Sequence, residues 1–289
     1  MRLFLLTALT MLAFAANSIL NRMALAAGDI DAMGFAVIRV AAGAAVLVLL
    51  AIVQRRRLPL VAPGRAAGVM SLCLYLIGFS VAYLRLDAGL GALILFGCVQ
   101  ITMFAGAVIA GETVPRARWI GAGVALIGLA WLVWPAGAVQ VPLLGTLFMA
   151  LAGAGWGVYS LAGRKSGDPL AATAANFLLA VPVCGAAALL LPGAAEPPAI
   201  TPRGVVLAGL SGAVTSGLGY ALWYSVLPRL DSAVAGLVQL TVPVIAILGG
   251  IALLGEGVSL RLAAAGAVVL GGIAYGLLAP QRRIGSSGS

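Results

Sequence analysis

The sequence predicts an all-α membrane protein in which ten transmembrane helices form two inverted five-helix repeats around a central cavity. Three observations predict this fold class. First, the composition is 63% hydrophobic and 9% charged, with a mean hydropathy of +1.14, whereas roughly 25% of the residues of a soluble protein are charged. Second, apolar runs of the length that a helix needs to cross a bilayer recur along the chain. Third, the sequence contains an internal repeat with an odd number of spans in each copy.

Charged residues, prolines and glycines separate the apolar runs from one another. The predicted spans cover residues 3–27, 33–53, 66–84, 88–110, 116–134, 142–163, 169–191, 204–226, 232–254 and 259–279. The runs are continuous, whereas the strands of a β-barrel would alternate in polarity. The spans divide into a first repeat (1–137) and a second repeat (138–284), and the GSSGS tail at 285–289 looks like a remnant of cloning outside the fold.

The distribution of positive charge predicts the orientation in the membrane. Twelve of the 17 Lys and Arg residues fall in the loops and tails on the side of the N-terminus, and such an excess marks the cytoplasmic side. We therefore expect a multi-pass protein of the cell inner membrane with both termini in the cytoplasm. The net charge of +9 does not predict a nucleic-acid partner, because the arginines lie at segment ends rather than on one face.

The internal repeat relates residues 85–133 to residues 229–277 at an offset of 144. Arg-Leu-Asp at 85–87 aligns with Arg-Leu-Asp at 229–231, and Gly-Glu at 111–112 aligns with Gly-Glu at 255–256. Because each unit holds five spans, the second copy must enter the membrane from the opposite side. Inverted repeats are typical of secondary transporters that alternate access to a site near the midplane.

The two repeated segments, which begin LDAGLGALILFGCVQ and LDSAVAGLVQLTVPV, resemble the EamA family of the drug/metabolite transporter superfamily. The overall pattern is most similar to the YddG-type amino-acid exporters. The resemblance implies ten helices, a cavity lined by the first four helices of each half, and export. The family often has a proline midway along the fourth helix of each half; Pro243 retains it as a candidate hinge or a plain packing kink, but Val99 replaces it in the first half.

Aromatic and amide side chains near the middle of several spans are the candidate substrate-binding residues. Tyrosines and other aromatics recur at four-residue spacing, and an amide inside a membrane needs a partner or a wet cavity. Core packing, helix–helix hydrogen bonding and an interfacial aromatic belt are the structural alternatives. The candidates are Asn17, Asn21, Tyr75, Phe79, Tyr83, Gln100, Trp156, Tyr159, Tyr220, Tyr224 and Gln239.

Several charged residues lie within or next to spans, and most of them have two possible roles. Arg22 and Arg39 lie five or six residues inside the predicted outer ends of their helices, so they either snorkel to the interface or give an outward vestibule a positive potential that attracts carboxylates. Asp87 directly precedes a span and is expected to cap its N-terminus. Glu256 ends the fourth span of the second repeat and is expected to form an interfacial cap or ion pair, with a coupling role as the alternative.

The chain lacks the groups that most enzymes need. Histidine is absent, the Walker phosphate-binding pattern is missing, and the three cysteines show no metal-ligand spacing. We therefore expect no enzymatic activity, no metal and no cofactor. No carboxylate falls near the middle of a span, which argues against organic-cation export and against carboxylate-based proton coupling.

Together these observations predict a secondary transporter that works as an exporter or facilitator by alternating access. The expected substrates are small neutral or zwitterionic metabolites, foremost amino acids with apolar or aromatic side chains, and the other partner is membrane lipid. A carrier of a nucleobase or vitamin and a non-transporting membrane scaffold are the alternatives. The chain is expected to be a monomer or homodimer, because the Gly-x-x-x-Gly pattern at Gly272 and Gly276 fits either internal packing or a dimer face.

Overall fold

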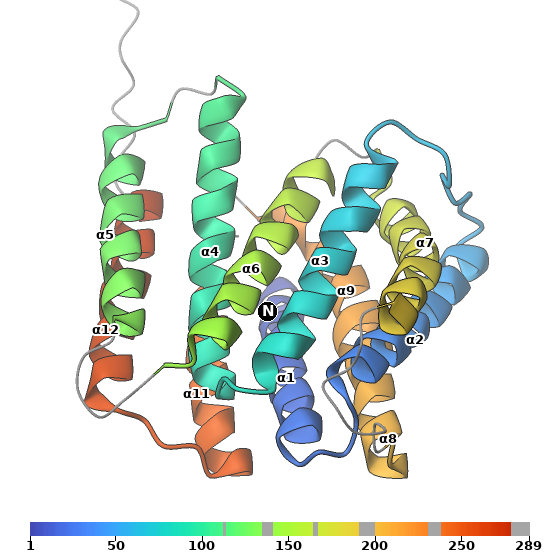
Figure 1. Ribbon diagram of the computed structural model, residues 1–289. Coiled ribbons are helices and arrows are strands. Elements are labelled where there is room, and N and C mark those ends of the chain that lie inside the picture. Colours follow the sequence, from blue (N-terminus) through green and yellow to red (C-terminus); the bar gives the residue numbers. More distant parts are fainter. Residues whose placement is uncertain (112–113, 135–140, 164–166, 191–199, 231–237, 279–289) are drawn as a thin grey trace, which may run out of the picture.

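A computed structural model describes residues 1–111, 114–134, 141–163, 167–190, 200–230 and 238–278 (Figure 1). Within these ranges the chain is helical and contains no strand. The first half forms α1 (Arg2–Ala26), α2 (Ala32–Val53), α3 (Arg65–Tyr83), α4 (Ala88–Ile109) and α5 (Arg116–Val133). The second half forms α6 (Leu143–Gly163), α7 (Pro169–Leu190), α8 (Pro202–Leu210), the π-helix η1 (Ser211–Leu218), α9 (Gly219–Val226), the 3₁₀ turn η2 (Leu227–Arg229), α11 (Thr241–Leu254) and α12 (Leu260–Leu278).

These helices fall on the predicted spans. Most of their ends lie within one or two residues of the predicted boundaries, because the charged and small residues between the apolar runs end the helices. Asp31, for example, caps α2 by accepting hydrogen bonds from the backbone N–H groups of Met33 and Gly34. Eight helical stretches among the described residues are long and apolar enough to cross a membrane; α5 is not among them, and α11 is a shorter apolar helix.

The predicted eighth and ninth spans differ from simple helices. The eighth span is a continuous helical stretch, Pro202–Val226, whose central part is the π-helix η1. The ninth span has a helical turn at Val238 and Gln239, a break at Leu240 and then α11. Pro243 is the third residue of α11. Because proline has no N–H to bond the carbonyl four residues earlier, it explains why the helix is not continuous at this point.

Consecutive helices run in alternating directions, so that α4 rises, α5 descends and α6 rises in the view of Figure 1. The turns α1–α2, α3–α4 and α11–α12 lie at the lower end of this view, and we refer to this end as the lower end. Helices of one half pack on helices of the other half. Thus α2 packs on α7, α5 on α12, α4 on α11 and α3 on α6, and the α8–α9 stretch packs on α1. The interior therefore lies between the halves.

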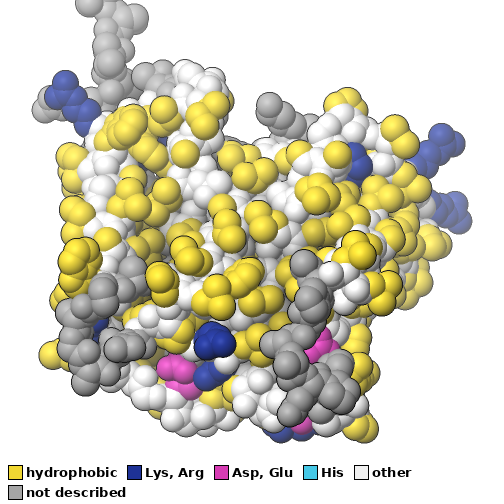
Figure 2. All heavy atoms as spheres, in the orientation of Figure 1, with side chains coloured by type: hydrophobic (Ala, Val, Ile, Leu, Met, Phe, Trp, Pro, Cys, Tyr) yellow, Lys and Arg dark blue, Asp and Glu magenta, His cyan; other side chains and the backbone are white. Residues whose placement is uncertain are grey.

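Apolar side chains cover the outside of the protein. Large hydrophobic residues such as Phe4 (74% exposed) and Ile109 (86% exposed) face outward, and Figure 2 shows hydrophobic side chains across the middle of one face with charged groups gathered toward its edges. An apolar surface of this extent is stable only in contact with lipid. With the apolar helices, this surface shows a multi-pass membrane protein.

The Gly-x-x-x-Gly pattern of α12 packs inside the chain, against α5. A Cβ atom built on Gly121 of α5 would lie 2.5 Å from the carbonyl oxygen of Gly272 and 3.0 Å from the Cα of Gly276. The backbones of α5 and α12 approach each other this closely because neither helix carries a side chain there. These two glycines of α12 thus serve an internal contact.

Replacing Gly121 with alanine should destabilise the protein, because the added methyl group meets backbone atoms that cannot move aside. We expect a loss of about 1–3 kcal/mol, as is usual for an overpacked contact. Gly123 on the same helix is the matched control, since nothing lies within 4 Å of a Cβ built there, and its replacement should be neutral or slightly stabilising. Thermal unfolding in detergent measures both variants, and equal midpoints would contradict the packing argument.

Candidate functional site

A small internal cavity lies at the centre of the helix bundle. Residues from α1, α3 and α4 of the first half and from α6 and α9 of the second half line it: Phe14, Asn17, Ser18, Tyr75, Phe79, Leu95, Phe96, Trp156 and Tyr220. The side chains leave room for about one or two water molecules. The cavity is therefore too small to hold a metabolite unless the lining side chains move apart.

Aromatic rings from both halves surround this cavity. The Trp156 ring lies 5.0 Å from Tyr75, 4.9 Å from Tyr220 and 5.4 Å from Tyr159, measured between ring centroids. Phe14 of α1 meets Trp156 and Tyr220 edge to face, with centroids 6.5 and 5.8 Å away. Because these contacts join α1 and α3 to α6 and α9, any movement of one half against the other must rearrange them.

Arg39 is the charged group at the centre of the protein. Its side chain on α2 is 0% exposed, its Nε donates to the Ser216 hydroxyl at 3.1 Å, and its Nη2 donates to the Tyr75 hydroxyl at 2.8 Å. The guanidinium also lies over the rings of Tyr75 and Phe79, 5.1 and 4.9 Å from their centroids. The structure thus places Arg39 inside the bundle, whereas the sequence predicted that it either snorkels to the interface or gives an outward vestibule a positive potential.

The π-helix η1 explains this placement. A π-helix usually marks a functional segment inside an α-helix, since it changes which residues face the neighbouring helix. Here it directs Ser216 toward Arg39 and brings its backbone close to α2: a Cβ built on Gly212 would lie 2.2 Å from the carbonyl oxygen of Arg39. The side chain of Arg39 is therefore covered by η1 and cannot reach the membrane interface.

Asn17 links the two halves beside Arg39. Its Nδ2 donates to the Tyr75 hydroxyl at 3.2 Å, and its Oδ1 accepts from the hydroxyls of Ser211 at 2.6 Å and Thr215 at 3.1 Å. Tyr75 accepts a hydrogen bond from both Asn17 and Arg39, so its own hydroxyl proton is left to donate. A continuous polar network therefore runs from α1 and α2 through α3 to η1.

Several buried polar atoms of this region have no hydrogen-bond partner. They are Nη1 of Arg39, the hydroxyl of Tyr220 and Oδ1 of Asn21, whose Nδ2 donates to the Ser80 hydroxyl at 3.2 Å. Most buried polar groups in native proteins are paired, so each orphan calls for an explanation. Two of these atoms, Nη1 of Arg39 and the Tyr220 hydroxyl, can donate a hydrogen bond, and unpaired donors beside a cavity are the arrangement that a polar ligand would complete.

The cavity brings together five of the predicted binding residues and not the others. Tyr83 and Tyr159 are buried but bond to the Ala88 carbonyl and the Thr173 hydroxyl. Tyr224 packs on the core near α6. Gln100 is half-buried on α4 and does not line the cavity, and Gln239 is a helical residue two positions before α11 that does not line it either.

Sequence reasoning missed part of the site. Phe14 and Ser18, which lie four positions apart, line the cavity together with Asn17, and this i, i+3, i+4 spacing on one helical face was a usable signal. Ser211, Thr215 and Ser216 carried no such signal, because the π-helix shifts their faces.

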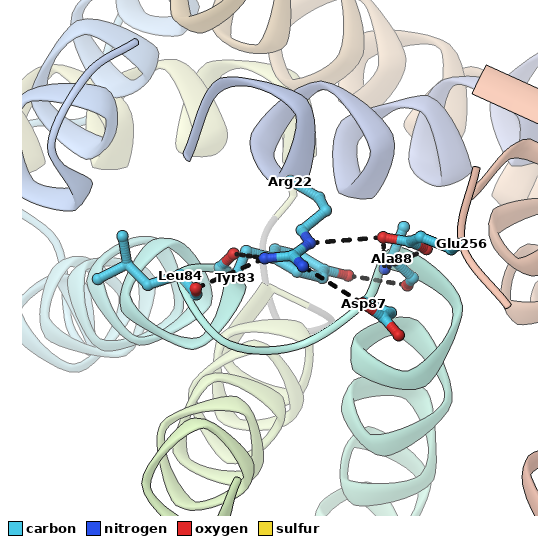
Figure 3. A network of polar contacts seen from close by, with 6 residues as sticks. All are labelled: Arg22, Tyr83, Leu84, Asp87, Ala88 and Glu256. Carbon is cyan, nitrogen blue, oxygen red and sulfur yellow. Dashed lines mark hydrogen bonds and ion pairs between the residues drawn. The ribbon is translucent and has the colours of Figure 1, made fainter. Parts of the chain in front are cut away.

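A second polar cluster, the Arg22 network, lies at the lower end of the bundle, and Figure 3 shows its side chains. Arg22 contacts Oε1 of Glu256 at 3.4 Å and Oδ1 of Asp87 at 3.3 Å, and it donates to the backbone carbonyl of Tyr83 at 3.0 Å. Arg22 therefore lies in a network that joins α1 to the α3–α4 and α11–α12 turns, and not in free contact with the interface.

Glu256 caps α4 in place of the residue expected to do so. Asp87 occupies the N-cap position but makes no side-chain capping bond, and both carboxylate oxygens of Glu256 accept from the Ala88 N–H, at 3.0 and 2.9 Å. Burial raises the pKa of Glu256, although the Ala88 N–H and Arg22 act in the opposite direction. A residue of the second repeat thus stabilises a helix of the first.

The comparisons with known proteins agree with this architecture. Residues 143–277 match the EamA-like transporter family. Over 280 residues the chain is 47% identical to the uncharacterized protein PA1977 of Pseudomonas aeruginosa, a match that covers 97% of this chain and 96% of that protein. A crystal structure of a protein that is 19% identical has a similar fold, with a TM-score of 0.67 and coverage of 97% and 99%. The second half of this chain is therefore similar to the EamA-like transporter family, and the whole chain is related to PA1977.

Proposed function

We propose that this protein is a secondary transporter of the inner membrane that moves small neutral or zwitterionic metabolites by alternating access. The observation that carries this proposal is the closed cavity of aromatic and polar side chains between the two halves. In this proposal α5 and α11 also cross the bilayer, which gives ten spans in two inverted repeats. Both termini are cytoplasmic, and the lower end faces away from the cytoplasm.

Amino acids with apolar or aromatic side chains are the substrates that this cavity fits best. Phe14, Phe79, Phe96 and Trp156 offer apolar walls, while the amide of Asn17 and the tyrosine hydroxyls can fix the orientation of a polar group. An ammonium group has no carboxylate to meet among the lining residues, but aromatic faces attract cations. The resemblance to YddG-type exporters supports export as the direction.

Alternating access would open the cavity to one side at a time as the halves rock against each other. The contacts that must change are the Arg22 network at the lower end and the ring contacts of Trp156 at the centre. The break at Leu240 before Pro243 provides a place where the ninth span can bend. No ion-coupling carboxylate lies among the cavity residues, so transport should run down the substrate gradient.

Replacing Trp156 with alanine should lower flux at least about tenfold, because the variant loses the ring that touches Tyr75, Tyr159 and Tyr220. The measurement is uptake of radiolabelled phenylalanine and leucine into proteoliposomes, with and without a pH gradient. Trp134 is the matched control: it is 65% exposed, and its replacement should leave flux within about twofold.

Three outcomes of this experiment would count against the proposal. Flux that does not saturate with substrate indicates a scaffold rather than a carrier. An equal loss of flux in the Trp156 and Trp134 variants shows that transport does not depend on the cavity. Accumulation that depends strictly on a pH gradient contradicts downhill transport.

A further inference from the structure

Arg39 has no anionic partner in the part of the chain that the structure describes. None of the ion pairs there involves it, and its bonds go to two neutral hydroxyls. Burying a charge costs several kcal/mol unless an opposite charge or a full set of hydrogen bonds offsets it. The hydroxyls and the ring faces of Tyr75 and Phe79 meet only part of this requirement, because Nη1 stays unpaired.

The second unpaired polar group belongs to a residue that lines the cavity. The Tyr220 hydroxyl is buried and makes no hydrogen bond of normal geometry, and it lies close enough to Arg39 and Tyr75 to interact electrostatically with both. Tyr220 also lines the cavity, as Tyr75 does. The wall of the cavity thus offers two phenolic hydroxyls, and the guanidinium of Arg39 lies directly behind it, against Tyr75 and Phe79. None of the ion pairs or hydrogen bonds of the described residues joins these groups to a carboxylate.

We propose that Arg39 and the Tyr220 hydroxyl form an anion subsite that binds the carboxylate of the transported substrate. This inference rests on the proposed function and names the substrate class more closely: small organic acids and amino acids, with the apolar remainder held among the aromatic rings. A carboxylate matches the guanidinium because its two oxygens accept parallel N–H bonds. It supplies the negative charge that Arg39 lacks in the closed empty protein.

Tyr75 connects the subsite to Asn17 and so to the rest of the polar network. Its hydroxyl accepts from Arg39 and from Asn17 in the closed state. A carboxylate that binds Arg39 competes with Tyr75 for the guanidinium, so substrate binding loosens the link between α2, α3 and α1. The network that holds the empty protein closed is therefore also the network that the substrate disturbs.

Three ligands that differ by one group test this subsite: phenylalanine, phenylalaninol without the carboxylate, and phenylpropionate without the ammonium group. We expect the purified wild-type protein to bind the two carboxylates at least about tenfold more tightly than the alcohol. The Arg39→Gln variant should lose about 10–100-fold in affinity for the carboxylates, as expected for a charge-assisted hydrogen bond. Its affinity for phenylalaninol should change little.

Tyr220→Phe keeps the inference testable even if Arg39→Gln folds poorly. The hydroxyl that it removes has no partner in the closed protein, so thermal stability should not fall, whereas carboxylate affinity should drop about three- to tenfold. Arg39→Lys, which keeps the charge but loses the planar pair of donors, should fall between wild type and Arg39→Gln. Arg203, with its side chain 59% exposed, is the control for charge alone, and Arg203→Gln should bind like wild type.

The outcomes separate this inference from the proposed function. Equal binding of phenylalaninol and phenylalanine by wild type, or unchanged carboxylate affinity in both Arg39→Gln and Tyr220→Phe, overturns the anion subsite. If saturable flux persists in that case, the transport proposal still stands. Conversely, carboxylate binding that depends on Arg39 without any flux in proteoliposomes supports the subsite and overturns transport.

Discussion

Replacing Gly212 with alanine is expected to cost about 3 kcal/mol or more of stability and to abolish transport. The Cβ of the new residue would lie 2.2 Å from the carbonyl oxygen of Arg39 and 2.8 Å from the Cβ of Ala42. Both neighbours belong to α2, a packed helix whose backbone cannot turn aside as a flexible side chain can. The cost therefore falls at the upper end of the range for overpacked cores.

The predicted loss of transport follows from the position of this contact. Moving η1 away from α2 separates the Ser216 hydroxyl from Nε of Arg39 and pulls Ser211 and Thr215 away from Asn17. The polar network beside the cavity then loses its bonds to the second half. A variant that still folds should consequently bind substrate more weakly.

Gly209 provides the control for Gly212. It lies on α8, three residues earlier in the same helical stretch, and nothing lies within 4 Å of a Cβ built on it. Gly209→Ala should unfold at the wild-type temperature or slightly above, since alanine favours a helix over glycine. Thermal unfolding in detergent and flux in proteoliposomes measure both variants, and a Gly212→Ala protein with wild-type stability would show that η1 does not pack as described.

Removing Arg22 is the second change with a large expected effect. Arg22→Met leaves the carboxylate of Glu256, whose side chain is 11% exposed, without its cation, and it removes the donors to the Tyr83 and Leu84 carbonyls. Removing one partner of a fully buried pair costs about 3–5 kcal/mol. Because the side chain of Arg22 is 18% exposed, we expect a smaller loss, about 2 kcal/mol.

The two acids of the network should respond differently. Asp87 is 47% exposed, so Asp87→Asn should cost little. Glu256→Gln in the Arg22→Met background should restore part of the lost stability, because it removes the unpaired buried charge. If Arg22→Met is as stable as wild type, or if Glu256→Gln fails to rescue it, the Arg22 network does not hold the lower end closed.

The raised pKa of Glu256 adds a pH dependence with a definite sign. Burial raises this pKa in the folded protein, so between the ordinary glutamate value of about 4.3 and the raised value the folded state binds more protons than the unfolded state. Stability should therefore fall as the pH rises through this window and level off above it. Unfolding temperatures measured across the window should show this slope in wild type and a flatter profile in Glu256→Gln; an opposite slope would contradict the burial argument.

In the proposed transport cycle, the same proton balance applies to opening of the lower end. When the turns separate, water reaches Glu256 and its pKa returns toward the ordinary value. Low pH should then favour the closed lower end and high pH the open one. This coupling acts through the gate and does not require a carboxylate in the substrate cavity.

The apolar runs and the charged and small residues between them allowed the helical membrane fold and the helix boundaries to be predicted from sequence, and the repeated segments pointed to the EamA-like family that residues 143–277 match. These properties are local or periodic: a bilayer requires about 20 apolar residues per span, and Asp31 or Pro243 acts on its own helix. The position of Tyr75 and Trp156 near the middle of their spans could also be predicted, by counting residues from the ends of each helix. Five of the eleven predicted binding residues line the cavity for this reason.

Only the tertiary structure decided what the charged residues meet. Arg39 lies at the centre because the π-helix η1 covers it, and Arg22 meets Glu256 across 234 positions of the chain. Sequence periodicity cannot reveal either contact, because a π-helix changes the phase of the helical faces and because pairs from different helices depend on packing. The sequence by itself therefore determined where the chain crosses lipid, while the packing of one half on the other decided which polar groups face the cavity.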